Sequence, residues 1–157
     1  MAENPILKRY LKQTSFVSEE DFRENFKLLI PKNFNFAYDV VDAWAEETPN
    51  KTALIWTNDE GKECRLSFSD LKKESDQAAS YLHTIGINRG DMVMLIEKRR
   101  LEWWITMLAL HKLGAVPIPA THMLTSHDIV YRCNAASVKA IICVGESYVL
   151  GEVQKAM

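Results

Sequence analysis

The stretch DMVMLIEKRRLEWWITMLALHKLGAVPIP, residues 91–119, decides the fold of this 157-residue chain. Met92 to Ile96 is an apolar run without alternation, which is typical of a strand covered on both faces. Leu101 to Leu113 is a predicted helix that is apolar nearly all round and ends at Gly114, and we expect its Trp103 and Trp104 to be buried in the core. Val116 to Pro119 is a second strand candidate, and its two prolines keep it from being fully paired.

The same alternation continues towards the C-terminus. Thr125 and Asp128 match a capping box at the start of a helix, and Ala140 to Val144 is a further buried strand. The residues from Glu146 onward predict one more helix. Strand, helix, strand, helix, strand at this spacing predicts βαβ units, so the fold class is α/β, with a parallel sheet flanked by helices.

The residues before this unit predict a helical N-terminal segment and a β-hairpin. Ser18 and Asp21 match a capping box, and Pro31 ends the helix that they begin. Residues 58–61 supply the turn of the hairpin, and Gly86 closes the helix that follows it. The predicted elements are helices over 5–11, 18–30 and 36–48, strands over 52–56 and 64–68, and a helix over 71–85.

Composition indicates an ordinary soluble globular protein of one domain, since 47% of the residues are hydrophobic and 25% are charged. A formal net charge of −2 argues against a nucleic-acid partner. The one compact basic run, Lys98 to Arg100, is typical of a solvated helix start. No apolar stretch is long enough to span a membrane, and the N-terminus lacks the features of a secretory signal.

The cysteines indicate the compartment. Cys64, Cys133 and Cys143 are odd in number and have no CxxC spacing, so neither a disulfide framework nor a metal site is expected. We therefore expect reduced thiols and a cytoplasmic protein.

Candidate binding residues are few. The turn from Gly86 to Gly90 is the nearest approach to a phosphate-binding loop, but no Lys or Ser/Thr follows it, which favours a plain turn. His122 and His127 are five residues apart, which does not place both on one helix face for a metal. Asp128 is the only nearby acid, so we interpret both histidines as structural or solvent-exposed.

Several segments resemble the adenylate-forming superfamily. Leu66-Ser-Phe-Ser-Asp-Leu71 resembles its first core motif, and Leu108-Ala-Leu-His-Lys-Leu-Gly-Ala-Val-Pro-Ile-Pro-Ala120 resembles its second. Three further segments resemble the acetyl- and medium-chain acyl-CoA synthetase branch: Phe34 to Trp44, Glu102 to Trp104, and Ala120 to Arg132.

The resemblance implies a partial N-terminal domain of the adenylate-forming fold. Residues 1–33 would be a helical N-terminal extension, and residues 34–157 the first part of the large AMP-binding domain, ending before the phosphate loop. The full-length enzyme would activate a short- or medium-chain carboxylic acid with ATP and Mg²⁺ to an acyl-adenylate, and then transfer the acyl group to CoA. Thr121, His122 and Met123 would contact CoA or the acyl chain.

No catalytic residue of the family falls on this sequence, so we expect the chain alone to be inactive and to bind none of ATP, Mg²⁺ or CoA. Two other functions stay open: a short non-catalytic binding or interaction module, and an adenylation domain that loads a carrier protein. An exposed sheet edge would also allow self-association.

Overall fold

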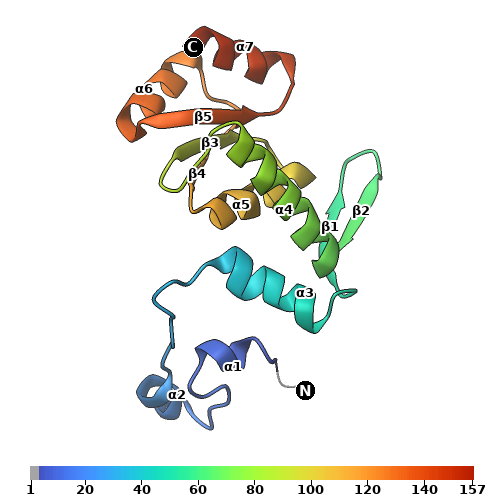
Figure 1. Cartoon of the computed structure of the whole chain (residues 1–157), viewed down its shortest axis with the longest axis vertical. Helices are drawn as coiled ribbons and strands as arrows, with labels where there is room; N and C mark the ends of the chain where they lie inside the picture. The colour runs from blue at the N-terminus through green and yellow to red at the C-terminus, as the bar shows by residue number, and fades with distance from the viewer. Residues whose placement is uncertain (1–3) are drawn as a thin grey trace.

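The apolar run Met92–Ile96 forms strand β3, the centre of a parallel three-stranded sheet, in the computed structural model, which describes residues 4–157. Its neighbours are β4 (Val116–Pro119) on one side and β5 (Val138–Cys143) on the other, so the strand order is β4-β3-β5 (Figure 1). The prolines of β4 therefore lie at a sheet edge, as the sequence predicted. The α/β fold class is confirmed.

Helices cover both faces of this sheet. One face packs against α4 (Phe68–Thr84) and α5 (Leu101–Leu113), and the other against α6 (Ser126–Ala136) and α7 (Ser147–Ala156). Helix α7 confirms the last helix expected from the sequence.

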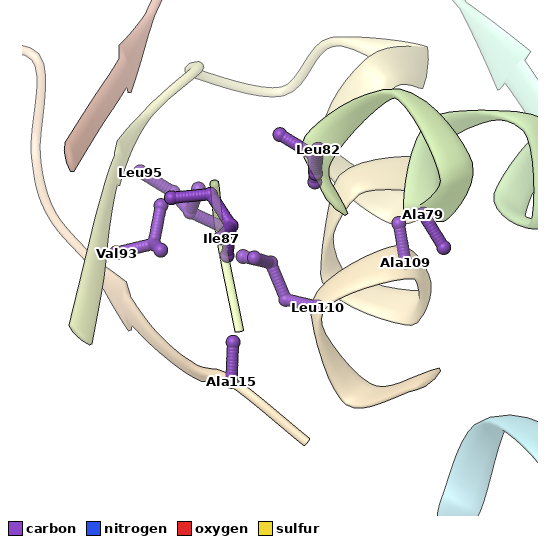
Figure 2. Close-up of a cluster of buried hydrophobic side chains, with 8 residues drawn as sticks. All are labelled: Ala79, Leu82, Ile87, Val93, Leu95, Ala109, Leu110 and Ala115. Atoms are coloured by element: carbon purple, nitrogen blue, oxygen red, sulfur yellow. The ribbon is translucent and has the colours of Figure 1, made fainter. Parts of the chain in front are cut away.

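Alternate residues of β3 serve the two faces. Val93 and Leu95 join the cluster with α4 and α5 that Figure 2 shows, whereas Met94 and Ile96 join the cluster with α6 and α7. All four are almost completely buried, and burying each side chain of this size stabilises the fold by roughly 1.5–3 kcal/mol. Burial on both faces explains why the strand carries no polar residue.

The hairpin and the N-terminal helices come before the sheet. Strands β1 (Thr52–Thr57) and β2 (Glu63–Ser67) pair antiparallel, which confirms the hairpin. Before them, a π-helical turn η1 (Ala37–Asp42) runs directly into α3 (Ala43–Glu47) and so accounts for the single helix expected there. The two short helices at the start are α1 (Leu7–Tyr10) and α2 (Glu19–Asn25).

Helix α2 is shorter than the sequence predicted. It was expected to reach Pro31, but it ends at Asn25 because the next residues pair with the segment after α1. The Leu29 N–H donates to the Tyr10 carbonyl at 2.8 Å, and Leu11 and Leu28 form an isolated antiparallel bridge. Backbone pairing outweighed the helical spacing of the apolar residues here.

The expectation that both tryptophans of α5 are buried was wrong. Trp103 is half-buried, but Trp104 is 48% exposed and packs edge-on against Trp103, with ring centroids 4.7 Å apart. An all-round apolar helix is usually buried all round. Helix α5 instead keeps part of its surface outside the core of the described residues.

The glycines that close helices behave as predicted. Gly86 follows α4 with φ 94°, and Gly114 caps α5 with φ 69°, a left-handed conformation that suits glycine. At Gly114 an added Cβ would also lie 3.1 Å from Cγ of Arg89, so the Arg89 side chain would have to shift slightly to make room for it.

Capping boxes begin α4 and α6, and the one predicted at Thr125 and Asp128 is present. In α4 the Asp70 N–H donates to Oγ of Ser67 at 3.1 Å, and the Ser67 N–H donates to Oδ2 of Asp70 at 3.0 Å. These bonds satisfy N–H groups that have no partner inside the helix.

We predict that Ser67→Ala lowers the free energy of unfolding by about 1 kcal/mol, because the Asp70 N–H loses its acceptor. Urea unfolding monitored by circular dichroism measures this change. Ser69→Ala, an exposed serine at the second position of the same helix, is the matched control and should change stability by less than about 0.5 kcal/mol. Equal effects of the two variants would contradict the capping role.

A buried ion-pair cluster joins η1, α4 and α5. The Lys112 side chain is only 1% exposed, and its Nζ lies 2.6 Å from Oδ1 of Asp76 and 3.0 Å from Oδ1 of Asp42. The contact with Asp76 is a hydrogen bond, whereas the contact with Asp42 lacks hydrogen-bond geometry. Lys72 also contacts both aspartates. Buried charges of this kind persist only when they are paired.

Within residues 4–157, no helix is both long enough and apolar enough to cross a membrane.

Candidate functional site

Ligands of open α/β sheets bind outside the carboxyl ends of the strands. The loops after β3, β4 and β5 come together there with the turn of the hairpin. They surround a cavity of about 660 Å³, here called the hairpin groove. The groove is lined by Trp56, Thr57, Asn58, Asp59, Glu60, Lys98, Arg99, Arg100, His122 and Glu146.

Two of the three basic residues after β3 pair with one carboxylate after β5. Lys98 Nζ donates to Oε2 of Glu146, and Arg100 Nη2 donates to Oε1 of the same side chain at 3.1 Å. These hydrogen bonds hold the pKa of Glu146 below its usual range. The run was expected to be a solvated helix start; it does precede α5, but it also lines the groove and ties β3 to β5.

Because Lys98 and Arg100 are paired with Glu146, Arg99 is the residue of this basic run that is available to bind a ligand. Its carbonyl accepts a hydrogen bond from Nε1 of Trp56 at 2.7 Å, which attaches the loop to the hairpin. In the part of the chain that the structure describes, no carboxylate pairs with its guanidinium. A planar guanidinium in this position suits a carboxylate or phosphate, which it can bind through two parallel hydrogen bonds.

The three residues expected to contact CoA or the acyl chain follow β4 at the same end of the sheet. The structure brings His122 into the groove beside the basic run. Thr121 and Met123 are exposed and do not line the groove; Met123 is 68% exposed, and its N–H donates to Oγ1 of Thr121 at 3.3 Å. Their contact with CoA or an acyl chain stays a prediction.

The turn from Gly86 to Gly90 is a plain turn, as predicted. It leads into the amino end of β3, opposite the groove, and the N–H groups of Gly86, Ile87, Asn88 and Gly90 already have acceptors. The Asn88 N–H donates to Oδ2 of Asp91 at 2.6 Å, and the Gly90 N–H donates to the Gly114 carbonyl at 2.9 Å. A phosphate-binding loop needs such N–H groups free.

The residues of this chain do not fit the phosphates of ATP or Mg²⁺. A phosphate loop needs Ser, Thr and Gly followed by Lys, and none of the six glycines has that context. Among residues 4–157, no group of three or more His, Cys, Asp or Glu side chains could hold a metal ion. No step of ATP chemistry therefore follows from these residues.

Sequence reasoning missed Glu97, the residue directly after β3. Glu97 is only 5% exposed; the Thr106 hydroxyl donates to its Oε1 at 3.2 Å, and its Oε2 has no hydrogen-bond partner among the described residues. Burial raises the pKa of this carboxyl, and the nearby Glu102 raises it further against the opposing effect of the Thr106 bond. A charged residue directly after an apolar strand was the available signal.

This raised pKa predicts how stability depends on pH. Because the folded chain holds the Glu97 proton more tightly than the unfolded chain, stability from this residue is complete below the unfolded pKa and falls as pH rises through and above it. Wild type should therefore lose more stability between pH 4 and pH 7 than Glu97→Gln does, as measured by urea midpoints. Glu63→Gln, an exposed residue of β2, should behave like wild type. A Glu97→Gln variant as pH-sensitive as wild type would contradict the raised pKa of Glu97.

The three cysteines are free and half-buried, as expected. Burial raises the pKa of the thiols of Cys133 and Cys143, so both are poor nucleophiles at neutral pH.

Comparison with known proteins identifies the family to which this chain belongs. The family model for AMP-binding enzymes matches residues 41–157. The chain is 39% identical over 134 residues to acyl-coenzyme A synthetase ACSM3, mitochondrial, of Homo sapiens, covering 82% of this chain and 23% of that protein. It is 40% identical over 119 residues to acyl-coenzyme A synthetase ACSM5, mitochondrial, of Rattus norvegicus, covering 72% of this chain and 21% of that protein.

Solved structures agree with the fold. A benzoate CoA ligase from Burkholderia xenovorans LB400 superposes with a TM-score of 0.67 at 26% identity, over 78% of this chain and 24% of that one. A fatty acyl CoA synthetase of Mycobacterium tuberculosis gives a TM-score of 0.68 at 20% identity, over 76% of this chain and 23% of that one.

The chain spans about a fifth of the length of the curated relatives it matches. Neither relative named here is an acetyl-CoA synthetase, so the acetyl side of the expected branch has no support from them. Both are named as mitochondrial proteins, and the cytoplasmic compartment expected from the cysteines stays a prediction. The chain belongs to the AMP-binding enzyme family of adenylate-forming proteins and is homologous to the acyl-coenzyme A synthetases named above.

Proposed function

We propose that this chain is the N-terminal portion of an AMP-forming acyl-CoA synthetase. In full length the enzyme would activate a short- or medium-chain carboxylic acid with ATP and Mg²⁺ and transfer the acyl group to CoA. The observation that carries this proposal is the family match over residues 41–157, together with relatives that are about 40% identical and named acyl-coenzyme A synthetases. We also propose that residues 34–157 are the first part of the AMP-binding domain and that residues 1–33 extend it.

The hairpin groove would form part of the channel for CoA or the acyl chain. Arg99 supplies a guanidinium with no carboxylate partner among residues 4–157, and Lys98 and His122 line the same cavity. Thr121 and Met123 flank His122 and would reach the same ligand. Phosphates and carboxylates are the anionic groups of such ligands, and arginine recognises both.

In the full-length enzyme, we predict that Arg99→Ala raises the KM for CoA roughly tenfold and leaves the KM for ATP unchanged, because one charge-assisted hydrogen bond to the ligand is lost. Arg23→Ala, an exposed arginine of α2, is the matched control and should change neither value. An unchanged KM for CoA in the Arg99 variant would contradict the proposal that the hairpin groove is part of the channel.

The chain alone would be catalytically inactive, because the residues that could bind the phosphates of ATP are missing from it. CoA, rather than a carrier protein, is the proposed acceptor, since the relatives named above are acyl-coenzyme A synthetases. A cytoplasmic location is proposed from the free cysteines, and fractionation of cells against mitochondrial and cytosolic markers tests it.

The outer edge of β5 supports the proposal that the chain alone self-associates. Within residues 4–157, β5 pairs with β3 on one side only. An unpaired edge is a template for another strand, so the chain alone would self-associate as its concentration rises. Sedimentation velocity at several concentrations measures this, and a monomer at all concentrations would contradict it.

The proposal is tested by the reading frame beyond Met157, determined together with the intact mass of the protein in its source. A frame that continues into a Ser/Thr/Gly-rich loop followed by Lys, with a mass several times 18.0 kDa, is the expected result. A stop codon directly after Met157 and a mass of 18.0 kDa would instead favour the short non-catalytic module.

A further inference from the structure

A second cavity, of about 420 Å³, lies between the carboxyl ends of β3 and β5 and is here called the β3–β5 crevice. Its lining includes Glu97 and Glu102 from the β3 side and Cys143, Gly145 and Glu146 from the β5 side. The crevice shares Arg100 and Glu146 with the hairpin groove, but it contains neither His122 nor Arg99. Its volume falls within the roughly 300–1,000 Å³ of small-molecule sites.

The topology of the sheet explains why a crevice opens at this place. The strand order β4-β3-β5 means that the chain begins in the centre, moves to one side and then crosses to the other (Figure 1). Helix α5, which follows β3, packs on one face, whereas α7, which follows β5, packs on the opposite face. In this arrangement the connections diverge between the first and third strands, and ligands bind at that point.

A buried carboxyl group with one unused oxygen lines the crevice. Glu97 is 5% exposed, and its Oε1 accepts from Thr106, whereas its Oε2 has no partner in the described part of the chain. Leaving such a buried acceptor without a donor is unfavourable. A ligand that donates a hydrogen bond to Oε2 would remove this penalty.

The charges around the crevice determine the kind of donor. Lys98 and Arg100 both pair with Glu146 and together carry one more charge than it does, whereas no cation within residues 4–157 pairs with Glu97 or Glu102. Glu102 lies in the first turn of α5, where the helix dipole favours its ionised form. The crevice therefore presents two carboxyl groups without a paired cation, and its carboxylates do not form a metal-binding group among residues 4–157.

We propose that the β3–β5 crevice binds the primary ammonium group of a small organic amine, with Glu97 as its counter-ion. An ammonium group has three donors, of which one would satisfy Oε2 of Glu97 and another would reach towards Glu102. The alkyl part of the amine would lie along Cys143 and Gly145 at the end of β5. This site shares Arg100 and Glu146 with the hairpin groove, but the proposal does not depend on the acyl-CoA synthetase function proposed above.

The test is a calorimetric titration of the 157-residue chain with n-butylammonium chloride, compared with n-butanol as its uncharged counterpart. We expect saturable binding of the cation and at least about tenfold weaker binding of the alcohol. Glu97→Gln, which keeps the size of the side chain and an acceptor for Thr106, should weaken cation binding about tenfold as well. Glu63→Gln, on the exposed surface of β2, is the control and should bind like wild type.

A second pair of variants tests the crevice without changing Glu97. One variant fills the crevice, and the other is its control. An added Cβ at Gly145 meets no atom within 4 Å, so Gly145→Leu can be accommodated and would occupy the space of the amine. Gly151→Leu, at an equally open position in α7, is its matched control. Loss of binding in the first variant and retention in the second is the expected result. Equal binding of butanol, unchanged binding by Glu97→Gln or Gly145→Leu, or no saturable binding of the cation would each overturn the proposal. Saturable binding of Mg²⁺ that depends on Glu97 would overturn it too.

Discussion

Replacing Lys112 by alanine is expected to lower the free energy of unfolding by about 3 kcal/mol, because the buried Asp42 then keeps only the more distant Lys72, at 3.7 Å, as a cationic partner. Asp42 is itself buried, and Lys112 is its nearest cation, at 3.0 Å. The same lysine lies 2.6 Å from Asp76, so the substitution removes the ion pairs that link α5 to η1 and to α4. Urea or thermal unfolding monitored by circular dichroism measures the change.

Lys73→Ala is the matched control for this prediction. Lys73 is an exposed lysine of α4, one residue after the Lys72 of the cluster, and alanine is a good helix former. Its replacement should change stability by less than about 0.5 kcal/mol. If Lys112→Ala were as mild as Lys73→Ala, the cluster would not stabilise the fold.

The second large effect is expected at Leu110, in the cluster between α4, α5 and the sheet. Leu110 is completely buried, and Figure 2 shows it pointing from α5 towards Ile87. Leu110→Ala should lower the free energy of unfolding by about 2–5 kcal/mol, since it removes buried apolar surface and leaves a cavity.

Leu150→Ala provides the comparison, because Leu150 is a leucine on helix α7 and is 39% exposed. Its replacement should lower the free energy of unfolding by less than about 1 kcal/mol. Chemical denaturation of the two variants under the same conditions separates burial from the intrinsic preference of leucine for helices. Similar losses in both variants would show that the core does not lie between α5 and the sheet.

The sequence predicted the elements in which local signals and packing agree. Met92–Ile96 reads as a doubly covered strand because only an apolar side chain is stable on either face of a central strand. The capping box at Thr125 and Asp128 was predictable because the same local bonds form whatever packs against the helix. The hairpin was predictable from its turn residues for the same reason.

Elements that depend on distant partners were not predictable in the same way. Helix α2 stops at Asn25 because residues 27–29 pair with residues 10–12, and no local pattern announces that pairing. The exposure of Trp104 likewise depends on where α5 lies, which its uniform apolar sequence does not specify.

The candidate site was predictable only in part. His122 was singled out through the family resemblance, and the structure places it in the hairpin groove. The partners of Lys98 and Arg100 were not predictable, because Glu146 lies more than 40 residues away and meets them only through the parallel pairing of β3 with β5. Glu97 was missed since a single charged residue after a strand is usually exposed.

The central proposal is most directly tested by acid-dependent exchange of pyrophosphate into ATP, followed by thioester formation with CoA. The polypeptide of the whole reading frame would be assayed with butyrate, hexanoate and octanoate, beside the 157-residue chain alone. The account predicts exchange that depends on the acid, and an acyl-CoA product, with the longer polypeptide, and no exchange above background with the 157-residue chain. Exchange by the 157-residue chain, or none by the longer polypeptide with any of the three acids, would contradict it.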